Sequence, residues 1–224
     1  MTGAARGIGA AIAARLLADG LEVETLDREA GADHRLDLAA HPLPDFGDVD
    51  VCVSNAAITD TIAPAHRMTA EQWQRDLDVN LTGAFRVVQA CLVGMRERSF
   101  GRIVVISSGA ARAGLPGQVA YAASKAGLIG MVKTIAAENA GHGVTANAVL
   151  PGMVGTEKVR AMPAEVLEAV TASLPAGRMA TPEEVAALVA FLASEEAGYI
   201  TGETIGIDGG FGLNTLSLTR PGAR

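Results

Sequence analysis

A glycine-rich segment at the start of the chain places the strongest limit on its fold. Residues Thr2–Gly9 read TGAARGIG and lead into a run in which Ile8, Ile12 and Leu16 recur at helical spacing, with Gly20 as a stop signal. Glycines at a loop-to-helix junction let backbone N–H groups approach a pyrophosphate at the positive end of the helix. The pattern predicts a nucleotide-binding α/β domain. Taken alone, the segment fits a tight turn packed on a neighbour equally well.

Strand-like and helical patterns alternate along the rest of the chain. This alternation predicts a Rossmann-type, doubly wound and mainly parallel sheet with helices on both faces. With 224 residues and 49% hydrophobic content, a single domain over residues 1–224 is expected. The predicted strands are 21–27, 34–38, 48–54, 101–106, 144–149 and 205–207, and the predicted helices are 70–95, 119–139 and 182–193.

A strand is expected before the glycine loop, and the chain begins at Met1 without it. In doubly wound sheets this strand is central and buried on both faces. Its absence removes ~3–5 buried apolar side chains, or about 5–15 kcal/mol, which is comparable with the stability of a whole domain. The expectation is therefore that the natural protein starts roughly ten residues upstream. An in-frame stop codon directly before Met1 would contradict it.

A tyrosine and a lysine lie four residues apart in the predicted helix 119–139 and therefore share one helical face. An ammonium close to the Tyr121 phenol would lower its pKa from the ordinary ~10 and allow proton exchange near neutral pH. Alone, the pair Tyr121 and Lys125 is a weak signal. Ser107 and Ser108 follow the predicted strand 101–106, at the edge where open α/β sheets bind ligands.

Five motifs occur in one order along the chain: TGAARGIG at 2–9, SNAA at 54–57, DVNL at 78–81, the serines with YAASK at 107–125, and PGMVGT at 151–156. Together they resemble the short-chain dehydrogenase/reductase family over nearly the whole chain. SNAA stands where the family usually has NNAG, which removes one glycine. The resemblance implies hydride transfer between NAD(H) and a secondary alcohol or ketone.

The resemblance also implies a role for each catalytic residue. Tyr121 acts as general acid/base, Lys125 lowers its pKa and bonds the nicotinamide ribose, and Ser108 orients the substrate oxygen. Asn80 is implied to hold a water that links Lys125 to solvent. Ser107 is expected to be a structural hydroxyl at the strand end.

Asp27 ends the predicted strand 21–27. Its separation from the glycine loop along the chain is the one at which an acidic residue bonds the hydroxyls of the adenosine ribose. Because a carboxylate repels a 2′-phosphate, Asp27 favours NAD. Arg6 and Arg28 could each bind that phosphate, so NADP is the alternative. The residues implied to contact the cofactor are Gly3, Arg6, Gly7, Ile8, Gly9, Asp27, Arg28, Asp37, Leu38, Asn55, Ala56, Ala57, Tyr121, Lys125, Pro151, Gly152, Val154 and Thr156.

A lid over about residues 153–180 is implied to close on a small-molecule substrate. The expected pocket residues are Ser108, Gln118, Met153, Val159 and Met162. An alternative is an NADPH-dependent 3-oxoacyl thioester (ACP or CoA) reductase, because LPAGRMATPEEVA at 174–186 resembles that branch. An alternative of another class is a non-catalytic nucleotide-binding or scaffold protein. The missing strand and the short link between residues 27 and 55 favour it.

Charge and cysteine usage exclude other classes. A net charge of −7 and a pI near 5.1 oppose nucleic acid or an anionic membrane as a partner, and no stretch approaches the ~18 apolar residues of a membrane span. Cys52, Cys91 and four scattered histidines form no metal-binding spacing, so no metal is expected.

The segment from Arg6 to Arg15 could be mistaken for a targeting peptide, but no cleavage-like site follows it, so a cytoplasmic location is expected. The family resemblance further implies a homotetramer. The apolar tail, with Leu213, Leu216 and Leu218, is expected either to pack across a neighbouring subunit or to be disordered.

Overall fold

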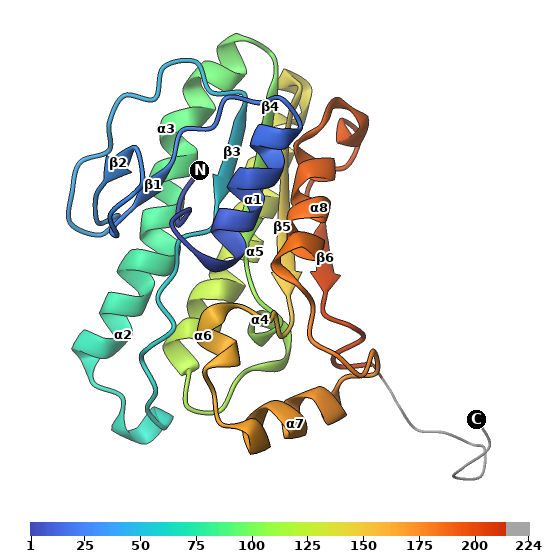
Figure 1. Cartoon of the computed structure of the whole chain (residues 1–224). Helices are drawn as coiled ribbons and strands as arrows, with labels where there is room; N and C mark the ends of the chain where they lie inside the picture. The colour runs from blue at the N-terminus through green and yellow to red at the C-terminus, as the bar shows by residue number, and fades with distance from the viewer. Residues whose placement is uncertain (214–224) are drawn as a thin grey trace.

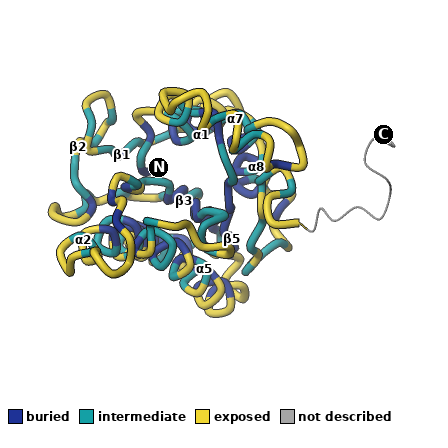
Figure 2. Tube along the Cα trace, turned by 90° about the horizontal axis from the view of Figure 1, so that it is seen from below, coloured by how far each residue is buried: buried dark blue, intermediate teal, exposed yellow. Residues whose placement is uncertain are grey.

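In a computed structural model, which describes residues 1–213, the main sheet has four parallel strands in the order β3-β4-β5-β6. These are β3 (Val51–Ser54), β4 (Gly101–Ile106), β5 (Val144–Pro151) and β6 (Thr204–Ile207). Every residue of β4 and β5 is buried, because helices cover both faces of the sheet (Figures 1 and 2). The predicted doubly wound α/β fold is confirmed.

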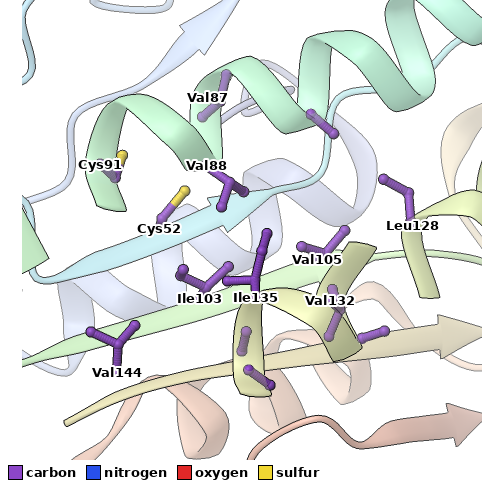
Figure 3. Close-up of a cluster of buried hydrophobic side chains, with 14 of the residues drawn as sticks. Cys52, Val87, Val88, Cys91, Ile103, Val105, Leu128, Val132, Ile135 and Val144 are labelled. Carbon is purple, nitrogen blue, oxygen red and sulfur yellow. The ribbon is translucent and has the colours of Figure 1, made fainter. Parts of the chain in front are cut away.

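Two hydrophobic clusters hold the helices to the sheet. On one face, α3 (Gly83–Glu97) and α5 (Val119–Asn139) pack on apolar side chains of β3, β4 and β5, among them Cys52, Ile103 and Val144 (Figure 3). On the other, α1 (Gly7–Ala18) packs beside α8 (Pro182–Ala193). Alternate residues of β4 serve the two clusters, with Ile103 in the first and Val104 in the second, as the period of a strand requires.

The amino-terminal edge of the sheet is much shorter. Strand β1 (Leu26–Asp27) pairs in parallel with β2 (His34–Arg35) in a separate two-stranded sheet. The first residues of the chain lie between β1 and β3 (Figure 1), where Thr2 N donates to Val53 O at 3.1 Å and Leu26 N donates to Met1 O at 2.8 Å.

Three predicted strands are therefore too long. Residues 21–25 and 36–38 are not strand, and β3 begins at Val51 rather than at 48. A strand needs a hydrogen-bonded neighbour, and among residues 1–213 the backbone groups of 21–25 bond only single backbone groups: Leu21 N donates to Leu16 O, Glu24 O accepts from Met1 N and Thr25 O accepts from His34 N. As expected for so short a link, residues 36–50 contain no helix.

Capping signals place the helix starts correctly. Thr69 forms a capping box with Gln72 at the start of α2 (Ala70–Leu77), and Thr181 forms one with Glu184 at α8. The single helix expected over 70–95 is interrupted, because a π-helical turn, Asp78–Thr82, separates α2 from α3. The remaining short elements are η1 (Ala65–Arg67), α4 (Ala110–Ala113), η3 (Ala140–His142), α6 (Glu157–Arg160), α7 (Ala164–Ser173) and η4 (Glu195–Ala197).

Within residues 1–213, no helix has both the length and the apolar character of a membrane span. The same residues contain no cluster of metal-ligating side chains. The expectation for the tail, including Leu216 and Leu218, lies outside the described residues.

Candidate active site

Ser108 and Tyr121 meet at the carboxyl end of β4. Ser108 lies two residues past the last residue of β4, and Tyr121 stands in the first turn of α5. The Ser108 side chain lies close enough to the Tyr121 phenol to act on its pKa. Ser108 Oγ also accepts from Ala110 N at 3.1 Å, which fixes the serine side chain. The structure thus brings Ser108 and Tyr121 together, and the catalytic role of Ser108 stays a prediction.

Lys125 lies one helical turn further along α5 and is 2% exposed. Its Nζ donates to Ile106 O at 2.7 Å and lies 5.9 Å from the centre of the Tyr121 ring. Burial lowers the pKa of Lys125 to about 8. Ser107 Oγ donates to Lys125 O at 2.7 Å and so ties the helix to the strand end, which fits the structural role expected of Ser107.

The pKa of Tyr121 differs from the sequence expectation. Burial raises it above the ordinary value, and the hydrogen bond with Ser108 opposes that rise. The predicted lowering by Lys125 is wrong in this structure. The physical reason is that the phenol is withdrawn from water, which disfavours the charged phenolate, while the Lys125 ammonium is bonded to Ile106 O.

Asn80 is fully buried in the π-helical turn between α2 and α3. Its Oδ1 accepts from Ile58 N at 2.8 Å, and its Nδ2 donates to Ile58 O at 3.0 Å and to Ser124 Oγ at 3.4 Å. The Asn80 side chain thus joins the loop after β3 to α5. π-Helical turns are often found at functional sites. The water-holding role of Asn80 stays a prediction.

A cleft of about 210 Å³ opens beside the glycine loop. Inside it, Asp27 Oδ2 accepts from Ala5 N at 3.0 Å and Asp27 Oδ1 accepts from Glu29 N at 3.0 Å. Arg6 pairs with Glu29 at 2.9 Å. The predicted cofactor residues that line this cleft are Gly3, Arg6, Asp27, Arg28, Asp37, Leu38, Asn55, Ala56 and Ala57.

The start of α1 fits a pyrophosphate group. The cap residue Arg6 makes no side-chain cap hydrogen bond, and the first turn of α1 carries no acidic residue. Its first N–H groups are therefore available to an anion. Gly7 adopts φ 58° and Ile8 is half-buried.

Gly3 and Gly9 are required by close packing. A Cβ on Gly9 would lie 1.8 Å from Gly3 O, and one on Gly3 would lie 2.8 Å from Ala56 Cα. The glycine loop therefore has the tight packing on a neighbour that the sequence alone allowed, and it also leaves N–H groups available to an anion.

The PGMVGT segment lies at the carboxyl end of β5. Pro151 O accepts from Gly109 N at 3.0 Å, and a Cβ on Gly152 would meet Asp208 Cα at 2.8 Å. Val154 is buried, and Thr156 caps α6. A Cβ on Gly7 would approach Thr156 Cγ2 to 3.4 Å, so this segment faces the glycine loop as the cofactor prediction requires.

The expected substrate residues surround the same edge of the sheet. Gln118 Nε2 donates to Thr59 O at 2.9 Å. Met153 and Val159 are half-buried and Met162 is exposed.

Sequence reasoning missed seven residues near the site. The cleft beside the glycine loop is also lined by Leu26, Glu29, Leu36, Ile58 and Val79, and Lys158 Nζ donates to Thr59 Oγ1 at 2.7 Å. Ile58 and Thr59 directly follow the SNAA motif and Val79 precedes Asn80, so adjacency to the motifs could have revealed these three.

Comparisons with known proteins agree with this geometry. A family model described as enoyl-(acyl carrier protein) reductase matches residues 33–212. The chain is 44% identical over 232 residues to acetoacetyl-CoA reductase of Rhizobium meliloti, covering 94% of this chain and 96% of the relative.

Two further relatives have similar coverage. The 3-oxoacyl-[acyl-carrier-protein] reductase MabA of Mycobacterium tuberculosis is 42% identical over 227 residues, covering 95% of this chain and 92% of MabA. The 3-oxoacyl-[acyl-carrier-protein] reductase FabG of Vibrio cholerae is 41% identical over 233 residues, covering 94% and 95%.

Proposed function

The chain belongs to the short-chain dehydrogenase/reductase family of nicotinamide-dependent oxidoreductases, and we propose that it interconverts a ketone and a secondary alcohol at the 3-position of an acyl thioester. One observation carries the proposal: the hydroxyls of Ser108 and Tyr121 and the ammonium of Lys125 gather at the carboxyl end of β4. That edge of the sheet also holds the nucleotide cleft.

The nicotinamide cofactor supplies or accepts the hydride when it is bound. In the reducing direction the Tyr121 phenol donates a proton to the substrate oxygen. The Ser108 hydroxyl donates a hydrogen bond to the same oxygen while negative charge develops there. Because burial raises the pKa of Tyr121, the phenol is protonated at neutral pH, and this favours the reducing direction.

Lys125 supports the proton transfer from within the helix. With a pKa of about 8, its ammonium is mostly charged at neutral pH. In this structure the ammonium is bonded to Ile106 O, so it would stabilise the phenolate left after proton donation only by leaving that carbonyl. Lys125 is also proposed to bond the nicotinamide ribose. Asn80 fixes the loop after β3 against α5, and a water that links Lys125 to solvent is proposed beside Asn80.

NAD(H) is proposed ahead of NADP(H). The Asp27 carboxylate stands in the cleft where the adenosine ribose is expected, and Arg6 is partly neutralised by Glu29. Both features disfavour a 2′-phosphate. Arg28 lines the same cleft and supports the NADP(H) alternative. The other cofactor contacts are proposed at the predicted residues of the glycine loop, SNAA and PGMVGT.

The thioester substrate is proposed from the names of the relatives, which reduce acetoacetyl-CoA and 3-oxoacyl-[acyl-carrier-protein]. A substrate lid over residues 153–180 is also proposed. Its two ends are held together, because Ala180 N donates to Met153 O at 3.0 Å and Gly155 N donates to Ala180 O at 2.8 Å. Helix α7 within it buries none of its residues.

Assembly and location are proposed as well. A homotetramer built from a single domain is supported by Phe85 and Val93, which expose 44% and 61% of their area on α3. A cytoplasmic location is supported by the free thiols of Cys52 and Cys91, because reducing compartments keep thiols unpaired.

Steady-state kinetics with acetoacetyl-CoA, a simple ketone, NADH and NADPH tests the proposal. We expect the highest kcat/KM with acetoacetyl-CoA and NADH. The variant Asp27→Asn should lower the NADH-to-NADPH ratio by about tenfold, since one like charge near the phosphate is worth ~1 kcal/mol or more, whereas the exposed Asp45→Asn should not change it. A preference of the native chain for NADPH would overturn the cofactor assignment. Cofactor binding by fluorescence without any turnover would favour the non-catalytic alternative.

A further inference from the structure

One buried carboxyl group has no part in the mechanism described so far. Asp76 lies in the last turn of α2, is the one residue of that helix that is buried, and has none of its surface exposed. Acidic side chains are almost never fully buried unless they are paired, yet the adjacent Arg75 pairs with Asp60 at 3.1 Å. Burial raises the pKa of Asp76. Ionisable groups in such surroundings are concentrated at functional sites.

The two carboxyl oxygens of Asp76 have different surroundings. Oδ1 accepts a hydrogen bond of 2.6 Å from Thr61 Oγ1, and Thr61 is 5% exposed. Oδ2 is buried and has no hydrogen-bond partner among residues 1–213. If the carboxyl group were removed, the buried Thr61 hydroxyl would lose its acceptor. The bond to Thr61 is therefore the contact through which Asp76 can act on the rest of the site.

Residues 58–61, which we call the strap, are tied at both ends to the helical segment 70–82. At one end, Asn80 bonds Ile58 N and Ile58 O through the two polar atoms of its side chain. At the other end, Asp76 bonds Thr61. Asp76 and Asn80 are four residues apart, so they lie on one face of the helical segment. The strap is thus clamped by two fully buried polar side chains.

Thr59, inside the strap, contacts two other parts of the site. Its carbonyl oxygen accepts from Gln118 Nε2 at 2.9 Å, and its hydroxyl oxygen accepts from Lys158 Nζ at 2.7 Å. Gln118 is the N-cap residue of α5, three positions before Tyr121. Lys158 belongs to α6, within the proposed lid. The strap therefore joins the start of α5 to the lid.

We propose that Asp76 is a positioning residue for the substrate pocket. By binding Thr61 it fixes the strap, and the strap sets where Thr59 meets Gln118 and Lys158. Asp76 does not line the nucleotide cleft, so it acts through these contacts and leaves cofactor affinity unchanged. The pocket and the lid are those of the proposed function, on which this inference rests.

Thr61→Val and Asp76→Ala each remove the bond that fixes the strap. We expect either variant to raise KM for acetoacetyl-CoA by about tenfold at saturating cofactor, because the loss of one buried hydrogen bond is of that size. kcat should stay within about a factor of three, since no reacting group changes. The double variant should raise KM no further, because both changes act on one bond. The control Glu71→Ala removes an exposed carboxylate from the same helix and should have the native KM.

Conservative variants separate a positioning role from a purely structural one. Thr61→Ser keeps the donor and Asp76→Asn keeps an acceptor, so both should retain the native KM. A lower melting temperature with native KM in Thr61→Val and Asp76→Ala would overturn the proposal, because Asp76 would then only support folding. Should Asp76→Ala fail to fold, Thr61→Val decides the outcome, since valine replaces threonine with little change of shape.

Amide hydrogen exchange tests the role of Asp76 without turnover. Ala63 N donates to Gly117 O, beyond the strap, and the amides of 160–162 are bonded within the lid. Exchange at these amides should be at least ~10-fold faster in Asp76→Ala than in the native chain, and unchanged at 101–106. Absence of turnover of acetoacetyl-CoA by the native chain would reject the proposed function alone. Unchanged exchange at Ala63 and at 160–162 would overturn the positioning role of Asp76.

Discussion

The two halves of the sheet differ in how firmly they hold their functional residues. Strands β4 and β5 pair over Gly101–Ile106 and are buried throughout, and they carry the segment that ends in Ser108. Strands β1 and β2 pair over two residues each, and they carry Asp27. The proposed proton-transfer residues thus belong to the firmly packed half, and Asp27, proposed to select the cofactor, belongs to the half that borders the cavity of about 790 Å³ between β1 and β3.

Separate parts of the fold therefore position the proposed proton-transfer residues, Ser108, Tyr121 and Lys125, and the proposed cofactor-selecting residue, Asp27. Lys125 and Ser107 are tied to the end of β4 by hydrogen bonds of 2.7 Å each. Asp27 is held by two backbone N–H groups, from Ala5 and Glu29. Changes in one half should therefore leave the function of the other largely intact.

The largest expected effect follows from Tyr121→Phe. Removing the hydroxyl removes the proposed acid, so kcat should fall at least ~100-fold. Cofactor affinity, measured by fluorescence titration, should stay within about a factor of three, because the cleft residues are untouched. The matched control is Tyr199→Phe at a fully exposed position, which should have native kcat. An unchanged kcat in Tyr121→Phe would remove the catalytic assignment.

The second effect compares core truncations in the two halves. Ile103→Ala in β4 creates a cavity in a fully buried site and should lower the free energy of unfolding by ~2–5 kcal/mol. Leu26→Ala in β1 enlarges the existing cavity of about 790 Å³ between β1 and β3, so its cost should be about 2 kcal/mol less. Urea denaturation of both variants measures the difference. Equal losses would show that the two halves are packed equally well.

The smallest expected effect is a change of the free energy of unfolding with pH, which arises from Lys125 in the firmly packed half. Burial lowers the pKa of Lys125 from 10.5 to about 8, so between these values the unfolded chain binds more protons than the folded chain. The free energy of unfolding therefore rises with pH across this interval, by about 2 kcal/mol between pH ~7.5 and ~9.5, and the penalty is present in full at lower pH.

Urea denaturation at the two pH values, compared with Lys125→Met, measures this contribution. The variant lacks the titrating ammonium, so its own change over the interval should be about 2 kcal/mol smaller. If the native chain and the variant change alike, the Lys125 ammonium is not penalised by burial.

In the firmly packed half, patterns in the local sequence are sufficient to predict the strands and helices. The strand 101–106 and the helix 119–139 were predicted with the bounds that the structure has, because β-branched runs and helical spacing agree there with the tertiary environment. The approach of Ser108 to Tyr121 followed from the family motif. At the amino-terminal edge the same rules placed a strand over 21–25 that does not form.

Sequence by itself determined the order of strands and helices, the capping boxes at Thr69 and Thr181, and the residue types at the site, because these depend on local periodicity and short-range hydrogen bonds. Only the tertiary structure decided the π-helical turn at Asn80, the raised pKa of Tyr121 and the cavity between β1 and β3. Each of the three depends on groups distant in sequence: Ile58 against Asn80, Ile106 against Lys125, and the first residues of the chain between β1 and β3. Desolvation and strand pairing are properties of what surrounds a residue in space, and a linear pattern does not contain them.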